Sequence, residues 1–435
     1  MLRAVARDSL ARNSVLIMGS TVGTAGLGYL YWLLAARQLP QPAIGTATAL
    51  ISVATVVSMV SNLGIGHMFI QRLPGAGRAA WSRIVSAGLA VGCASTFLAS
   101  FVAAALLSAA DANFGFLASA EGSAALIATA VALTASTLLD YVFIAHRASH
   151  GMLGRNLGVA GGKVVTLAAL TGAGVGGSGA VLLAWTLPSL VVTAYTLVVS
   201  LTRLQPGARL RGAGIGAELG HVRRSATGHH LINLAQAGPS ALLPVLVTAR
   251  LGAEANGHFY VAWMTASMLF MVSPAVASAM YAERSNQAAA GLPRAALVVL
   301  TVIGLPALAL FTGGDLILGL FSAGYAAEGE LLLRILVLAA VPDAITNLAV
   351  AHWRSLGEYR RCLRLNLLMA TTCLALTWLW LPGSGIEGAG IAWLVGQSAG
   401  AVVVAVHALR HRRPPGSRDE NPASVQPVRA GHRRS

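Results

Sequence analysis

The sequence predicts an all-α, polytopic membrane protein: twelve transmembrane helices in two six-helix lobes, related by a parallel repeat around a central cleft. Three observations support this fold class. First, 56% of the 435 residues are apolar and only 10% are charged, with mean hydropathy +0.69, whereas soluble proteins carry about 25% charged residues. Second, the basic residues alternate in number from one gap between apolar segments to the next. Third, the two halves share residues in the same order.

Twelve apolar segments are long enough to cross a bilayer, which takes about 20 residues each. The first is too long for the apolar core of a signal peptide and has no small-residue cleavage site, so we expect it to remain as an anchor. The predicted spans are 13–36, 43–70, 84–110, 122–145, 156–175, 179–201, 228–250, 258–281, 295–312, 331–351, 365–382 and 386–409.

Charge decides the orientation of these spans. Of the 30 basic residues, 26 fall on one side, against three on the other (Arg37, Arg250 and Arg334), and Lys163, the only lysine, lies inside a span. The positive-inside rule then predicts an even span count with both termini cytoplasmic. Because topology and anionic lipid headgroups account for the arginines, membrane lipids are expected partners and nucleic acid is not.

The two halves match in register. Gly45 recurs as Gly257, and Arg37 recurs as Arg250. Each half has six spans, so both halves enter from the same side and the repeat is parallel, as in transporters that work by rocking one lobe against the other. The predicted domains are an N-terminal lobe at 1–201, a cytoplasmic amphipathic linker at 202–227, a C-terminal lobe at 228–410 and a disordered basic tail at 411–435.

Several segments resemble the oligosaccharide flippases of the multidrug/oligosaccharidyl-lipid/polysaccharide (MOP) exporter superfamily. They are "AARQLPQPAIG" at 35–45, "SNLGIGHMFIQRLP" at 61–74, "LDYVFIAHRASHGMLGRN…GGK" at 139–163 and "ARLGAEANGHFYVAWMTASMLFMVSPAVASAMYAE" at 249–283. The resemblance implies a transporter of the bacterial plasma (inner) membrane. It would flip a polyprenyl-diphosphate-linked oligosaccharide to the outer leaflet for cell-surface polysaccharide biosynthesis, with polysaccharide polymerases or glycosyltransferases as further partners.

Three charges lie inside the predicted spans: Asp140, Lys163 and Asp343. A charge at mid-bilayer costs about 2.5–3.5 kcal/mol on insertion scales, so each needs a partner or water. We expect Asp140 and Lys163 to pair at similar depth, either as a bridge between two spans or in ion coupling. Asp343 has no obvious partner and is the preferred protonatable group; the alternative is a solvated helix break.

Polar residues also follow one face of the span at 228–250 and one face of the span at 43–70. They line a sugar-accommodating cleft or make interhelical hydrogen bonds. Arg37 and Arg250 are expected at the outer mouth of the cleft, where a guanidinium suits a diphosphate or an acidic sugar, or else as headgroup anchors. Arg12 and Arg72 are inner-side candidates for capturing phosphate. The uncharged candidates are Asn62, His229, Asn233 and Gln236.

No enzyme is expected. Gly161-Gly162-Lys163 lacks the other residues of a phosphate-binding loop, HExxH and GxSxG are missing, and the three cysteines have no metal-ligand spacing. We therefore predict no cofactor and no ATP hydrolysis, and leave coupling to H⁺ or Na⁺ open. Two alternatives remain at this point: a multidrug/cation antiporter of the same superfamily, or a non-transporting scaffold that recruits envelope enzymes.

Overall fold

A computed structural model describes residues 9–210, 215–225, 229–271 and 292–410. In these ranges the chain is almost wholly helical and contains no strand. Seven of the described helical segments are long and apolar enough to cross a membrane. The protein is therefore an all-α chain with several helices suited to spanning a bilayer. The predicted tail at 411–435 and the end of the predicted span 258–281 lie outside the described residues.

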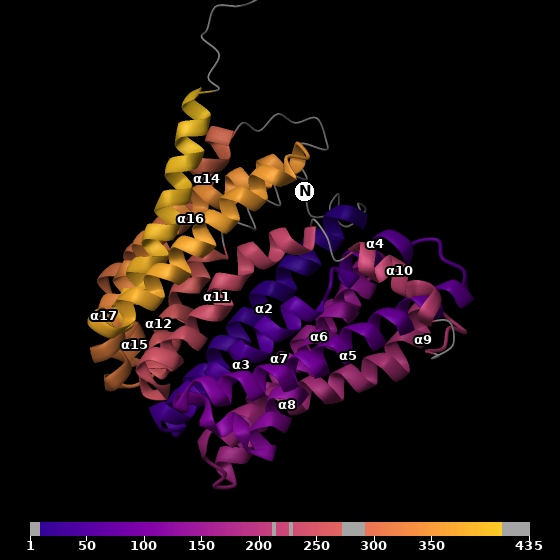
Figure 1. Ribbon diagram of the computed structural model, residues 1–435, viewed down its shortest axis with the longest axis horizontal. Coiled ribbons are helices and arrows are strands. Elements are labelled where there is room, and N and C mark those ends of the chain that lie inside the picture. Colours follow the sequence, from indigo (N-terminus) through magenta and orange to yellow (C-terminus); the bar gives the residue numbers. More distant parts are fainter. Residues whose placement is uncertain (1–8, 211–214, 226–228, 272–291, 411–435) are drawn as a thin grey trace, which may run out of the picture.

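The N-terminal group of helices runs from the first described residue to the start of the linker (Figure 1). Its members are α2 (Ser9–Gln38), α3 (Gln41–Ser61), α4 (Ile65–Arg72), α5 (Arg78–Ala110), the 3-10 helix η1 (Ala112–Ala118), α6 (Ala120–Ala145), α7 (Ser149–Gly172), α8 (Gly177–Tyr195), the π-helical turn η2 (Thr196–Ser200) and α9 (Leu201–Leu204). A separate helix, α10 (Ile215–Ser225), lies in the linker.

The C-terminal group comprises the remaining helices. They are α11 (His229–Leu251), α12 (Ala253–Phe270), α14 (Leu292–Thr312), α15 (Gly314–Gly319), α16 (Ala323–Ser355) and α17 (Tyr359–Arg410). The backbone of α17 is non-helical at Gly385 (φ 60°, ψ −151°), so two helices meet there. This break lies between the predicted spans 365–382 and 386–409.

The predicted span 43–70 is not one continuous helix. The left-handed residues Leu63 (φ 49°) and Gly64 (φ 70°) end α3 and start α4 in a new direction. Asn62 ends α3, and its Oδ1 accepts a hydrogen bond from the N–H of Gly66 at 3.5 Å. Hydropathy averaged over the segment misses this break because the apolar run continues through it.

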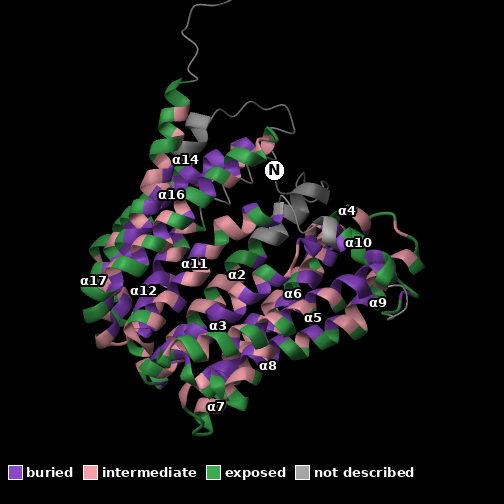
Figure 2. Cartoon of the chain, viewed as in Figure 1, coloured by how far each residue is buried: buried purple, intermediate pink, exposed green. Residues whose placement is uncertain are grey.

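Helix α3 joins the two groups. It packs against α5, α6 and α8 of its own group and against α11 and α12 of the other, and most of its residues are buried (Figure 2). We call the end of the bundle that carries α4 and α10 the inner end, and the end with the 38–41 and 251–253 turns the outer end. In Figure 1 one end of α17 rises at the top, and α4 and α10 lie at the right.

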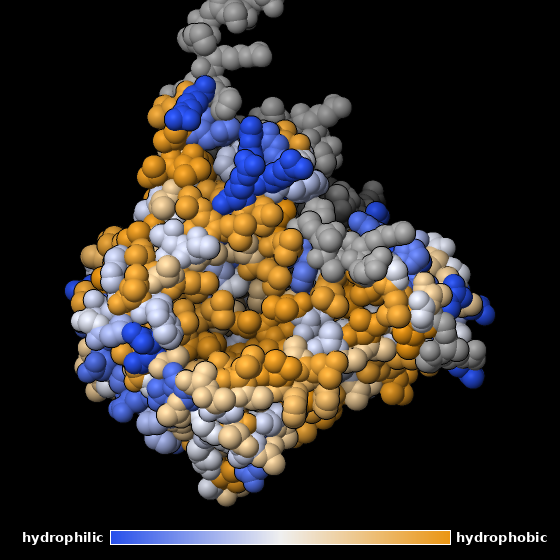
Figure 3. Space-filling model, viewed as in Figure 1, coloured by the Kyte–Doolittle hydropathy of each residue, from blue (hydrophilic) through white to orange (hydrophobic). Residues whose placement is uncertain are grey.

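The hydropathy of the surface changes between the inner end and the outer end of the bundle. On the face drawn in Figure 3, hydrophobic side chains dominate the middle of both groups, and hydrophilic ones gather toward the ends of the helices. This distribution suits a molecule whose middle faces lipid and whose ends face water.

Candidate functional site

A chain of polar side chains joins α11 to α16 inside the C-terminal group. The Nη2 of Arg354 donates to Oδ1 of Asn233 at 3.2 Å and to Oε1 of Gln236 at 3.0 Å. The Nε2 of Gln236 donates to Oδ1 of Asn347 at 3.2 Å, and the Nδ2 of Asn347 donates to Oδ2 of Asp343 at 2.9 Å. We call these five residues the C-terminal polar network.

The network brings together three of the predicted residues, Asn233, Gln236 and Asp343, and adds two that sequence reasoning missed. Asp343 is buried and has a described partner in Asn347, contrary to our expectation of none. The spacing of four residues from Asp343 to Asn347 places both on one face of a helix and could have revealed the pair. The side chain of His229 lies outside the described part of the chain.

A small cavity of about 20 Å³ adjoins this network between α11 and α17. Gln236, Gln397 and Cys373 are among its lining residues, and the volume is enough for about one water molecule. The network therefore has room beside it for about one water molecule, and its role in ion coupling or in binding sugar stays a prediction.

The N-terminal group contains an ionic cluster around Arg155. The guanidinium of Arg155 pairs with the carboxylate of Asp140 and donates to Oγ of Ser136 at 2.7 Å and to Oδ1 of Asn156 at 2.8 Å. Asn156 in turn donates to Oγ of Ser20 at 3.3 Å. The cluster therefore ties α6, α7 and α2 together.

The expected pair between Asp140 and Lys163 is wrong. Asp140 lies five residues before the end of α6 and Arg155 six residues after the start of α7, so the two face each other across the turn at 146–148. The error came from treating Arg155 as a surface arginine and measuring the depth of Lys163 from it. The side chain of Arg155 is only 3% exposed.

Lys163 instead contacts an aromatic ring. Its Nζ lies 3.1 Å from the ring centroid of Trp185 on α8. The ring of Trp185 packs in turn against Tyr31 and Trp32 of α2, with centroids 5.4 and 5.6 Å away. Trp32 reaches the other group of helices through Tyr260 of α12 at 4.9 Å. We call Tyr31, Trp32, Trp185 and Tyr260 the aromatic platform.

At the outer end, two repeat-related arginines make different contacts. The Nε of Arg37 donates to the carbonyl of Leu320, in the other group, at 2.6 Å, whereas the guanidinium of Arg250 lies 4.4 Å from the ring centroid of Trp378 in its own group. Each guanidinium already has a protein partner in this conformation. A role for both at the cleft mouth stays a prediction.

Repeat-related glycines mark the place where α3 crosses α12. A Cβ at Gly45 would clash with the backbone oxygen of Ala253 and lie 2.9 Å from the N of Gly257, and a Cβ at Gly257 would lie 2.8 Å from the oxygen of Gln41. The buried side chain of Asn256 donates to the oxygen of Gly45 at 2.9 Å and to Oγ1 of Thr48 at 3.0 Å. The two groups of helices are therefore in close backbone contact near the outer end.

At the inner end, Arg72 pairs with Glu218 of α10, whose side chain is only 4% exposed. Arg83 and His221 lie 3.9 and 3.6 Å from the same carboxylate. Arg72 therefore holds the linker helix in this structure, and Asn62 contributes to the start of α4. The side chain of Arg12 lies outside the described residues.

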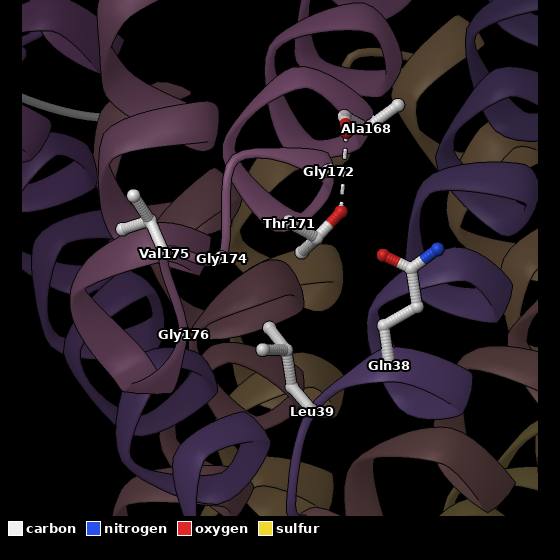
Figure 4. A pocket seen from close by; sticks show the side chains of 8 residues that line it. All are labelled: Gln38, Leu39, Ala168, Thr171, Gly172, Gly174, Val175 and Gly176. Carbon is white, nitrogen blue, oxygen red and sulfur yellow. Dashed lines mark hydrogen bonds between the residues drawn. The ribbon is translucent and has the colours of Figure 1, made fainter.

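A second, larger cavity lies at the outer end of the N-terminal group (Figure 4). It measures about 430 Å³ and is bounded by the end of α2 and by the turn between α7 and α8. Gln38 and Thr171 supply its polar side chains, and the Thr171 hydroxyl donates to the carbonyls of Leu167 and Ala168. No charged side chain lines it, so it does not suit a diphosphate.

No protein-family profile matches the chain, and no curated protein is significantly similar in sequence. Solved structures do match. A lipid II flippase, MurJ, in an inward closed conformation aligns with TM-score 0.73 and 11% identity over 91% of this chain and 87% of that one. An inward-facing MATE family multidrug transporter of the MOP superfamily aligns with TM-score 0.64 and 15% identity over 89% and 93%.

An outward-facing transporter of that family aligns with a lower TM-score, 0.53, at 16% identity over 92% of this chain and 94% of that one. The chain therefore has the fold of these transporters.

Proposed function

We propose that this protein flips a polyprenyl-diphosphate-linked oligosaccharide from the inner to the outer leaflet of a bacterial plasma membrane for cell-surface polysaccharide biosynthesis. It works by alternating access, without ATP hydrolysis and with both termini cytoplasmic. The observation that carries the proposal is a fold shared with a lipid II flippase, in which α3 of the N-terminal group packs against α11 and α12 of the C-terminal group, with close backbone contact near the outer end.

The distribution of charge supports a saccharide cargo. A cationic drug needs carboxylates to pair with, yet α2, α3 and α4 contain no acidic residue, and Asp140 is already neutralised by Arg155. The C-terminal polar network offers amide groups instead, which both donate hydrogen bonds to sugar hydroxyls and accept them.

One observation favours the alternative, a multidrug/cation antiporter. Asp343 is buried, and among the described side chains its carboxylate is bonded only by the neutral amide of Asn347. An intramembrane acid without a cationic partner is suited to exchange a proton or bind a cation. In the flippase, the same acid couples an ion gradient to the return step.

A transport assay in proteoliposomes that contain the purified chain distinguishes the flippase from the antiporter. We expect a fluorescent polyprenyl-diphosphate oligosaccharide to reach the opposite leaflet faster than in empty liposomes, and a cationic dye to remain where it was added. Accelerated dye movement with no movement of the lipid-linked sugar would overturn the proposal in favour of the antiporter.

A cellular test complements this one. Deletion of the gene should leave lipid-linked repeat units on the cytoplasmic face, and normal glycan export by the deletion strain would contradict the proposal. Removal of residues 411–435 distinguishes the flippase from a non-transporting scaffold. We expect glycan export to continue without the tail, whereas a scaffold that recruits enzymes through the tail would lose its function.

A further inference from the structure

Each group of helices has a short connector at its outer end. The N-terminal connector, residues 111–119, contains η1 and joins α5 to α6, and the C-terminal connector, residues 313–322, contains α15 and joins α14 to α16. The helix η1 packs on α5 and α6, and α15 packs on α14 and α16. Each connector is therefore fixed to its own group of helices and follows that group when the groups move.

The two connectors share an apolar pattern. Phe114 and Leu117 of the first and Leu318 and Phe321 of the second are at most 1% exposed, and the two members of each pair are three residues apart. In a helical turn this spacing places both side chains on one face. The shared pattern indicates that the connectors are equivalent parts of the internal repeat, each anchored by two buried side chains.

The C-terminal connector crosses to the N-terminal group. The Nε of Arg37, in the last turn of α2, donates to the carbonyl of Leu320 at 2.6 Å. Leu320 ends α15, where the carbonyls have no partner within the helix, and a guanidinium donor makes the bond charge-assisted. Beside this bond, the ring of Phe321 packs edge-on against Tyr29 of α2, with centroids 5.1 Å apart. One polar and one aromatic contact therefore join this connector to α2.

The N-terminal connector makes the reverse crossing. The Nδ2 of Asn113 donates to the carbonyl of Ala249, in the last turn of α11, at 3.3 Å, and η1 also packs against α11. Ala249 precedes Arg250, which is the repeat-related counterpart of Arg37. Each connector thus contacts the outer end of the first helix of the opposite group.

The two polar bonds can be broken and re-formed. The side chains of Arg37 and Asn113 are exposed, so water can replace the carbonyl that each one loses, and no buried polar group is left unpaired. Each connector is fixed to one group and bonded to the other, so separation of the groups at the outer end requires both bonds to break.

We propose that the two connectors form a reciprocal clasp that holds the outer end of the helix groups shut, with the bonds of Arg37 and Asn113 as its releasable contacts. Arg37 then acts on the equilibrium between a closed and an open outer end. The clasp rests on the alternating access of the proposed function and does not depend on the identity of the cargo.

A cysteine at Thr48 reports whether the outer end is closed. Thr48 is fully buried, and its Oγ1 accepts a hydrogen bond from Asn256 across the crossing of α3 and α12. The purified full-length protein carries Thr48→Cys and Cys93→Ser, and mass spectrometry follows its reaction with a water-soluble maleimide in detergent. A second reporter, Ser58→Cys, lies at a buried position of α3 that bonds within its own group, and it detects general loosening of the fold.

Arg37→Ala should raise the reaction rate of the Thr48 cysteine about tenfold, which corresponds to about 1.4 kcal/mol in the equilibrium between closed and open outer ends. Asn113→Ala removes a bond between neutral groups and should raise the rate less. The double variant should react faster than either single variant, because the two bonds oppose the same separation.

The matched control is Arg250→Ala. This repeat-related arginine packs on Trp378 of its own group, so the Thr48 cysteine should react at the parent rate in this variant. The Ser58 cysteine should stay protected in every variant.

A double variant in which the Thr48 cysteine reacts at the parent rate would overturn the clasp. An equal gain with Arg250→Ala, or an equal gain at the Ser58 cysteine, would also overturn it, since the effect would then not be specific to the connectors. The labelling assay contains no cargo, so its result is independent of the proposed function. Unchanged labelling with intact flipping removes only the clasp, and faster labelling without flipping leaves the clasp established.

Discussion

At the scale of single residues, the intramembrane charges differ in how completely they are compensated. Arg155 has an ion pair and two hydrogen bonds, Asp343 has one amide donor, and Lys163 has one aromatic face. Compensated charges stabilise a bundle, and uncompensated ones are available to a ligand or an ion. Arg155 therefore fits a structural role, and functional roles for Asp343 and Lys163 stay predictions.

Breaking the ion pair of Arg155 should destabilise the protein without a specific effect on transport. Arg155→Ala leaves Asp140 without its counter-ion and should lower the free energy of unfolding by about 3–5 kcal/mol. Thermal unfolding in detergent measures this loss. The matched control is Arg334→Ala, which removes an exposed pair with Glu330 and should cost about 0–1 kcal/mol. Equal losses in the two variants would contradict a structural role for the pair.

At the scale of helices, the crossing of α3 and α12 depends on the lack of side chains at Gly45 and Gly257. The repeat in the sequence pairs these two positions, and the structure places them against each other. Close backbone approach of this kind requires glycine. A side chain at either position would therefore force α3 and α12 apart at the crossing.

Gly45→Ala should hold the outer end open, because the added Cβ clashes with the backbone of α12. We expect a cysteine introduced at Thr48, which is fully buried at the crossing, to react with a membrane-impermeant maleimide in this variant and to be protected in the parent. Gly26→Ala on α2, where a Cβ meets nothing within 4 Å, is the control. Equal protection in both variants would show that the crossing tolerates a side chain.

The linker helix depends on one buried carboxylate. Glu218→Gln removes the charge that pairs with Arg72, so α10 should open more often. Hydrogen exchange over 215–222 should become faster, by about tenfold for each 1.4 kcal/mol lost from the free energy of opening of α10. Glu358→Gln, in a more exposed pair with Arg361, should not change exchange in α10. Unchanged exchange in the Glu218 variant would mean that apolar packing alone holds the helix.

At the scale of the molecule, the orientation in the membrane follows from the arginines. We expect a cysteine at Ala173, in the exposed turn between α7 and α8, to react with an impermeant maleimide added outside intact cells. A cysteine at Ala79, exposed near the start of α5, should react only after the cells are opened. Replacing Cys93 by Ser lowers the background, and the reverse pattern would invert the predicted topology.

Composition and charge were sufficient to predict an all-α chain and the approximate positions of the helices, because these depend on local hydropathy. The repeat marked Gly45 and Gly257 as equivalent positions, and only the structure places them in contact. The twelve-span count and the division into lobes stay predictions. The break at Leu63 and Gly64 was missed because left-handed backbone leaves no trace in hydropathy.

Side-chain partners were decided only by the tertiary structure. From the sequence, Arg155 and Arg354 were arginines of one membrane face, and Arg72 was a candidate for capturing phosphate. In the fold, Arg155 neutralises an acid, Arg354 organises a polar network and Arg72 holds the linker helix. The physical reason is that a long cationic side chain can turn toward water or into the bundle, and the choice depends on which acceptors neighbouring helices present. The sequence identified Lys163 as an intramembrane charge, and only the packing of α7 on α8 placed it against Trp185.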